Sequence, residues 1–211
     1  MGKYTEFYKK ENYYKKAKSE GYRARSAYKL RDIQYKFNIF KGAFYILDLG
    51  CAPGSWLQVI KEFAEKNLIK SKDKHFRRDH YKIMGVDLNK VSPIESIEII
   101  QRDINDPRLK EEILSYFKEK VDLVLSDASI NKIGNKFTDQ MNQINLCYVI
   151  LDLTKNILKL GGNFIIKVFQ GTDFNNFVKK LKQEFISVKS YKPKSSRKIS
   201  NEIYLIGIKK K

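Results

Sequence analysis

Cysteine and histidine are scarce in this chain. Its 211 residues include two of each, Cys51, Cys147, His75 and His80. The two cysteines are far apart, so the sequence indicates no disulfide framework, and a reducing compartment is expected. The four side chains also fit no zinc-ligand spacing, and we expect no metal site.

Long apolar runs are missing as well. No stretch reaches the ~18 apolar residues of a membrane span, so no membrane contact is expected. The first residues are basic and have no apolar segment of the kind that a secretory signal contains. Glu6, Glu11 and the lack of arginine there make a poor transit peptide. We therefore expect an intracellular protein, and the sequence does not distinguish cytoplasm, nucleus and organelle.

Positive charge, by contrast, is in large excess. Lysine and arginine number 42 against 24 acidic residues, which gives a formal net charge of +18. Such an excess indicates a polyanionic partner, with nucleic acid as the first candidate. The abundance of Lys, Asn, Ile and Tyr is also compatible with a coding bias, so charge alone leaves the partner open.

The apolar pattern predicts a single α/β domain over residues 1–211. With 42% apolar residues, the chain has the length and composition of one domain with a full core. Helical and strand-like spacings alternate, which is typical of a largely parallel sheet. The predicted helices are 23–38, 55–66, one opening near Pro107, 139–160 (stopped by Gly161 and Gly162) and 173–185. The predicted strands are 44–49, 83–87, 97–101, 121–126, 163–169, 186–191 and 203–209, the last two as an antiparallel hairpin.

Two segments carry no such pattern. Residues 1–20 are polar, basic and aromatic, and we expect an extension that contacts RNA or is mobile. The charged stretch KSKDKHFRRDHYK at 70–82 is expected to be an exposed loop.

The run DLGCAPGSW, from Asp48 to Trp56, is a glycine-containing turn after an apolar strand. Ligands of open α/β sheets bind beyond the carboxyl ends of the strands, and Gly50 and Gly54 would let the backbone approach one closely. The spacing matches neither the dinucleotide fingerprint nor the P-loop. Asp87 and Asp103 follow two further strands. S-adenosylmethionine offers a ribose, an adenine amine and a cationic sulfonium to such carboxylates. For the glycines alone, a structural βα turn is the alternative.

Four further runs each contain a charged residue in or near an apolar segment. They are RARSAYKL, LVLSDAS, FIIKVFQG and SNEIYLIG, with Lys29, Asp127, Lys167 and Glu202. A lysine between Ile166 and Val168 is costly to bury unless it is paired. Paired buried charges beside a cofactor turn indicate an active site, and methyl transfer onto a ribose hydroxyl is the expected reaction. The alternative is an ion-pair network that only joins strands to the first helix.

Taken together and in this order, the motifs resemble the FtsJ family of S-adenosylmethionine-dependent RNA 2′-O-ribose methyltransferases. The likeness runs from about Tyr22 to Gly207 and includes KPKSSRKISNEIYL. It implies a seven-stranded Rossmann-like sheet with helices on both faces and a catalytic tetrad of Lys29, Asp127, Lys167 and Glu202. It also implies cofactor contacts at Gly54, Trp56, Asp87, Asp103 and Asp127. We add the neighbouring residues of these motifs to the predicted cofactor site: Gly50, Cys51, Pro53, Ser55, Leu88 and Ile104.

The sequence departs from the family pattern after Asp127. It reads ASINKIG there, without the proline of many members, which leaves the contacts to the target nucleotide open. The stretch at 70–82 is also longer than a compact member needs.

Each tetrad residue receives a predicted role. Lys167 would be the general base or the alkoxide stabiliser, and Lys29 would orient the hydroxyl and disfavour a proton on Lys167. Asp127 would lie between the cofactor and the lysines, and Glu202 would orient Lys167. Cys51 is interpreted as a small buried residue of the turn rather than a nucleophile.

RNA would be held mainly through its phosphates, with some bases stacked on tyrosines. The candidate contacts are Arg23, Arg25, Lys192, Lys194, Arg197 and Lys198, with Tyr13, Tyr14 and Tyr22 for stacking. VFQG and the SSRKISNEIYL ending favour large-subunit ribosomal RNA, free or in the ribosomal particle, as the substrate of a monomeric enzyme, with a uridine as the modified nucleotide. Transfer RNA is the alternative, because RARSAYKL is shared by the tRNA-modifying branch. A catalytically silent RNA-binding or ribosome-assembly protein is the third hypothesis, and the intact tetrad argues against it.

Overall fold

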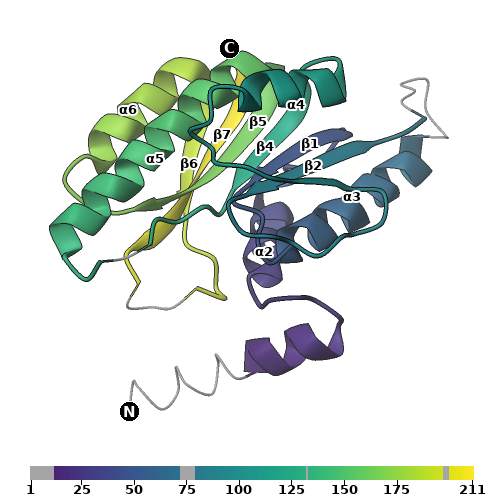
Figure 1. The fold of residues 1–211 in the computed structure, drawn as a ribbon, viewed down its shortest axis with the longest axis horizontal. Helices are drawn as coiled ribbons and strands as arrows, with labels where there is room; N and C mark the ends of the chain where they lie inside the picture. The colour runs from purple at the N-terminus through teal and green to yellow at the C-terminus, as the bar shows by residue number, and fades with distance from the viewer. Residues whose placement is uncertain (1–11, 72–78, 132, 197–199) are drawn as a thin grey trace.

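The computed structural model describes residues 12–71, 79–131, 133–196 and 200–211, and these form a sheet covered by helices on both faces. The sheet order is β3-β2-β1-β4-β5-β7-β6. β1 to β5 are parallel neighbours, whereas β7 pairs antiparallel with both β5 and β6. The predicted seven-stranded sheet with an antiparallel closing hairpin is thereby confirmed (Figure 1). The strands are β1 Tyr45–Leu49, β2 Lys82–Asp87, β3 Glu98–Gln101, β4 Val121–Ser126, β5 Leu158–Phe169, β6 Phe185–Tyr191 and β7 Glu202–Lys210.

The helices form two layers. α2 (Ala27–Phe37) and α3 (Ser55–Ser71) cover one face of the sheet, and α4 (Leu109–Phe117), α5 (Lys136–Ile157) and α6 (Phe174–Glu184) cover the other (Figure 1). β1 and β4 are buried along their whole length, because helices pack on both sides of them. No helix among the described ranges is long and apolar enough to cross a bilayer.

The long helix ends earlier than its sequence predicts. α5 stops at Ile157, and Gly161 and Gly162, expected to terminate it, lie inside β5 instead. Leu158 is extended, fully buried and paired with Val121 in the sheet. Burial of this leucine in the β4–β5 ladder therefore competes successfully with another helical turn. The register then shifts before the next pair, and Gly161 has a φ of 74° at this irregular part of the strand.

Other boundaries differ by less. α2 begins at Ala27 rather than at residue 23, and α4 begins at Leu109 rather than at Pro107. α3 continues to Ser71, past its predicted end at residue 66, so the helix includes the start of the expected loop. The centre of that loop, 72–78, lies outside the described residues.

The second half of the N-terminal extension has core contacts that its polar sequence did not predict. Residues 12–19 are helical, and Ala17 is only 2% exposed. The ring of Tyr13 lies 5.4 Å from that of Tyr28 on α2. This part of the extension therefore packs on the domain, while residues 1–11 lie outside the described ranges.

Candidate active site

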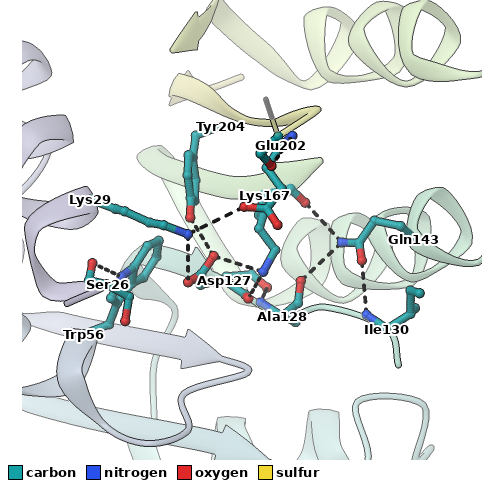
Figure 2. Close-up of polar contacts among 12 residues, drawn as sticks. Ser26, Lys29, Trp56, Asp127, Ala128, Ile130, Gln143, Lys167, Glu202 and Tyr204 are labelled. Atoms are coloured by element: carbon teal, nitrogen blue, oxygen red, sulfur yellow. Dashed lines mark hydrogen bonds and ion pairs between the residues drawn. The ribbon is translucent and has the colours of Figure 1, made fainter. Parts of the chain in front are cut away.

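Lys167 and Asp127 meet at the carboxyl end of two neighbouring strands. The β4–β5 ladder ends with the pair Ser126 and Ile166, so the next residue of each strand is Asp127 and Lys167. Lys167 Nζ lies 3.1 Å from Asp127 Oδ1 and donates a 2.6 Å hydrogen bond to the Asp127 carbonyl oxygen (Figure 2). Because Lys167 is only 6% exposed, this pairing supplies the compensation that a buried ammonium requires.

Two further residues complete the cluster: Lys29 from helix α2, which packs on the sheet, and Glu202 from the start of β7. Lys29 Nζ, on α2, lies 4.0 Å from Asp127 Oδ2 and 3.7 Å from Glu202 Oε2. Glu202 opens β7 opposite Phe169, two residues beyond Lys167 on β5. The ion pair of Glu202 is therefore with Lys29, whereas the sequence led us to expect that Glu202 orients Lys167. The structure brings all four predicted residues together, with this change of partner.

Tyr204 belongs to the same cluster and was missed by the sequence reading. It stands directly opposite Lys167 in the β5–β7 pairing, and its hydroxyl donates a 2.6 Å hydrogen bond to Asp127 Oδ1. Lys29 Nζ lies 5.7 Å from the centre of its ring (Figure 2). A signal was present, because Glu202 and Tyr204 are two apart in a strand and so face the same side.

The electrostatics of the cluster fix two protonation states. Burial would raise the pKa of Asp127, but Lys167, Lys29 and the Tyr204 hydroxyl outweigh burial and hold this pKa below its usual value. Burial and the Asp127 carboxylate raise the pKa of Tyr204 well above its usual value. At neutral pH, Asp127 is therefore a carboxylate and Tyr204 a neutral donor. The two contacts with Asp127 leave one of the three donor positions of a Lys167 ammonium for a substrate oxygen.

The turn between β1 and α3 approaches this cluster through Gly50. A Cβ at Gly50 would lie 2.5 Å from the Cα of Ala128, the residue after Asp127, and Gly50 has a φ of 78°. The turn also binds Asp87 at the end of β2, whose Oδ2 accepts a 2.9 Å hydrogen bond from the Ala52 amide. Asp87 Oδ1 accepts from the Asn89 amide at 2.8 Å. Oδ1 also accepts from the Asn89 side-chain amide at 3.1 Å, so Oδ2 is the oxygen that keeps capacity for a ribose hydroxyl.

Asp48, two residues before Gly50, is fully buried without a partner. Within the described part of the chain, neither of its carboxylate oxygens has a hydrogen bond. Burial, with the charges of Asp127 and Asp87, raises the pKa of Asp48 well above its usual value. A buried polar group without a partner requires an explanation, and a cationic ligand at the adjacent turn would provide one. The turn thus fits a cation that carries a ribose.

The other predicted cofactor residues surround the turn. Trp56 is buried, and its Nε1 donates a 2.9 Å hydrogen bond to the Ser26 carbonyl, while the Ser55 and Ser26 hydroxyls are 2.7 Å apart. Cys51 is 3% exposed, and burial raises the pKa of its thiol, which suits a packed residue and not a nucleophile. Pro53 is exposed at the turn.

Three predicted cofactor residues lie toward the β3 edge. Leu88 is 63% exposed directly after Asp87. Asp103 follows β3, which pairs with β2 so that Asp87 is beside Gln101. Asp103 Oδ1 accepts a 2.8 Å hydrogen bond from the Asn105 amide, and Ile104 between them is half-buried. These side chains continue the row of strand ends that begins at the turn.

The predicted RNA contacts are placed less uniformly. The Arg23 guanidinium donates to three backbone carbonyls, those of Pro53, Ser92 and Pro93. Arg23 therefore fastens the chain before α2 to the cofactor turn, and because it is also exposed, its contact with a phosphate stays a prediction. Tyr22 is buried, with its hydroxyl bonded to Glu62, so it packs instead of stacking a base. Among the remaining candidates, Tyr14 and Lys194 are exposed, and Lys192 donates a hydrogen bond to the Ser200 carbonyl. Tyr13 and Arg25 are half-buried. Arg197 and Lys198 lie outside the described residues.

Comparison with known proteins decides the family. The model of the FtsJ-like methyltransferases matches residues 22–210. The chain belongs to this family. It is 42% identical over 200 residues to the ribosomal RNA large subunit methyltransferase E of Methanothrix thermoacetophila, over 95% of this chain and 72% of that protein. It is 41% identical to the protein of the same name from Rickettsia bellii, over 94% of this chain and 84% of that protein.

Solved structures of methyltransferases have the same fold as this chain. A crystal structure from Plasmodium falciparum, assigned as a ribosomal RNA methyltransferase, superimposes with a TM-score of 0.72 at 33% identity and covers 90% of this chain and 98% of that one. A Streptococcus mutans structure in complex with S-adenosylhomocysteine has a TM-score of 0.50, covers 85% of this chain and 97% of that one, and at 15% identity shares the fold alone. The FtsJ-like enzyme described here is a methyltransferase, and S-adenosylmethionine is its cofactor.

Asp87→Ala tests where the cofactor binds. The substitution should weaken binding of S-adenosylmethionine by about 1.5–3 kcal/mol, the contribution of a charge-assisted hydrogen bond. Isothermal titration calorimetry measures this change. Glu98→Ala, at the opposite end of the neighbouring strand, is the control and should bind normally. Unchanged affinity in Asp87→Ala would exclude the placement.

Proposed function

We propose that this enzyme transfers a methyl group from S-adenosylmethionine to a ribose 2′-hydroxyl of large-subunit ribosomal RNA, with a uridine as the modified nucleotide. The observation that carries this proposal is the buried pair of Lys167 and Asp127, beside the turn that fits the cofactor. The names of the two curated relatives support ribosomal RNA over transfer RNA as the substrate. Such a substrate would place the enzyme wherever its ribosomes are assembled, and a monomer remains our prediction.

The chemistry required of the protein follows from the weak nucleophilicity of a ribose hydroxyl. When bound, S-adenosylmethionine supplies an electrophilic methyl group. Lys167 as a neutral amine accepts the hydroxyl proton, or as an ammonium it stabilises the developing alkoxide, and in both roles Asp127 fixes its Nζ from two directions. Lys29 adds a second positive charge on the opposite side of Asp127. Glu202 and Tyr204 orient Lys29 and Asp127, respectively.

Nucleotide-resolution mapping of 2′-O-methylation in depleted cells tests the substrate. Loss of one methylated ribose in large-subunit rRNA, restored by the wild-type gene but not by Lys167→Ala, supports the proposal. Loss of a methylated tRNA ribose instead would establish the alternative substrate. Unchanged methylation with defective ribosomes, rescued equally by Lys167→Ala, would show a ribosome-assembly protein without catalysis.

The affinity for RNA should fall steeply with salt. Cations at phosphates release counterions on binding, and the chain carries a net charge of +18. Lys194→Glu, at an exposed position between β6 and β7, should flatten the slope of log Kd against log salt by about 1 or more. Lys120→Glu, just before β4 and so at the opposite end of the strands, changes charge equally and is the control. Filter binding over a salt series provides the slopes, and a flat wild-type slope would refute the electrostatic argument.

A further inference from the structure

Gln143 is a buried amide in the middle of α5, outside all the motifs of the sequence analysis. It is 1% exposed. Its Nε2 donates to the Ala128 carbonyl at 3.2 Å and to the Lys167 carbonyl at 3.4 Å. Its Oε1 accepts a 3.1 Å hydrogen bond from the Ile130 amide. Figure 2 shows this side chain reaching from α5 to the segment after Asp127 and to β5.

These hydrogen bonds lie just past the point where the backbone pairing of β4 with β5 ends. The last pair of the β4–β5 ladder is Ser126 and Ile166. Beyond it, β5 continues alongside β7, whereas the chain after β4 leaves the sheet. Asp127 and Lys167 are the first residues past this point. The Gln143 amide therefore takes over from the ladder in joining the two backbones.

The distance between the reacting groups depends on that junction. Lys167 Nζ bonds both to the carboxylate and to the backbone carbonyl of Asp127. Displacement of the segment after Asp127 would move both acceptors relative to Nζ. Only a side chain with a donor and an acceptor on one terminal group can hold the Ala128 carbonyl and the Ile130 amide together, and glutamine has both.

We propose that Gln143 is a positioning residue for methyl transfer, which fixes Asp127 against Lys167 from the helix behind them. This inference depends on the proposed function of the tetrad. Gln143 touches neither substrate nor cofactor in this role, and it acts through its hydrogen bonds to the backbone of Lys167 and of the segment after Asp127. Removing its amide leaves three backbone groups, two of them buried, with fewer partners and lets the junction shift. A displacement of about 1 Å in a catalytic group can cost about 10²-fold in rate.

The test is the kinetics of Gln143→Met, which keeps the length of the side chain and removes its hydrogen bonds. We expect kcat for methylation of ribosomal RNA to fall about 10- to 100-fold, with the KM for RNA and the calorimetric Kd for S-adenosylmethionine unchanged. Rates are expressed per cofactor-binding site, so that loss of folded protein does not count. Gln183→Met, exposed on α6, is the control for the substitution and should keep the wild-type kcat.

A second variant and a double mutant separate positioning from stability. Gln143→Asn keeps the amide on a shorter side chain that cannot reach both segments, and it should show the same loss of kcat. In a Lys167→Ala background, Gln143→Met should lower kcat no further, since its effect passes through Lys167. Wild-type kcat per cofactor site in Gln143→Met or Gln143→Asn, or full additivity with Lys167→Ala, would overturn the inference. Inactivity of the wild-type enzyme toward ribosomal RNA would instead refute the proposed function.

Discussion

Lys167→Ala should reduce methyl transfer by about 10²–10⁴-fold, the usual loss when a positioned acid–base group is removed. The fold and the affinity for S-adenosylmethionine should stay nearly intact, because Asp127 keeps Lys29 at 4.0 Å and the Tyr204 hydroxyl at 2.6 Å. Single-turnover rates with ribosomal RNA and calorimetry with the cofactor measure the two effects separately.

Lys159→Ala is the matched control. Lys159 lies on the same strand β5 and pairs with Asp122 of the same neighbouring strand β4, but at the opposite end of both. It should leave the methylation rate unchanged, which separates loss of a β4–β5 ion pair from loss of a catalytic group.

Lys167→Arg distinguishes the two roles left open for this lysine. A guanidinium stays protonated and cannot accept the hydroxyl proton, so if Lys167 is the base, Lys167→Arg should be no more active than Lys167→Ala. Near-normal turnover of Lys167→Arg would contradict proton acceptance. Lys167 would then act as an electrostatic clamp, and the proton would pass to solvent or to Asp127.

The tetrad could be predicted from the sequence because burial makes its residues conspicuous. A lysine within the apolar strand at 163–169 requires a partner, and the motif before this strand and the motif after it supply the acidic candidates Asp127 and Glu202. The choice of partner could not be predicted in the same way, since it depends on register. Glu202 lies opposite Phe169 and Tyr204 lies opposite Lys167, and an offset of two residues in the β5–β7 pairing would have placed Glu202 opposite Lys167.

The fold order could likewise be predicted from alternating helical and strand periodicities, but some boundaries could not. A glycine pair such as Gly161 and Gly162 is typical of a helix C-terminus, yet α5 ends before it because Leu158 is buried in the sheet. Gln143 carries no local signal at all. Its position in α5 is unremarkable in sequence, and its importance arises only when three backbone groups from two other elements surround it.

Asp127→Asn should lower the free energy of unfolding at neutral pH by about 3–5 kcal/mol, the cost of leaving buried charges without their partner. The lysine side chains that would lose the carboxylate are 7% exposed for Lys167 and 14% for Lys29. Urea denaturation measures the change. Asp152→Asn on α5 removes an ion pair of a 78% exposed side chain and should cost about 1 kcal/mol or less.

The pH dependence of this loss identifies its cause. Because the pKa of Asp127 is lower in the folded protein than its usual value, its carboxylate stabilises the fold above the unfolded-state pKa of about 3.9. That stabilisation disappears as the pH falls through the lower folded-state pKa. The difference between wild type and Asp127→Asn should therefore be largest near neutral pH and shrink below about pH 4. A difference that stays constant down to about pH 3 would show that altered packing, and not the lost charge, destabilises the variant.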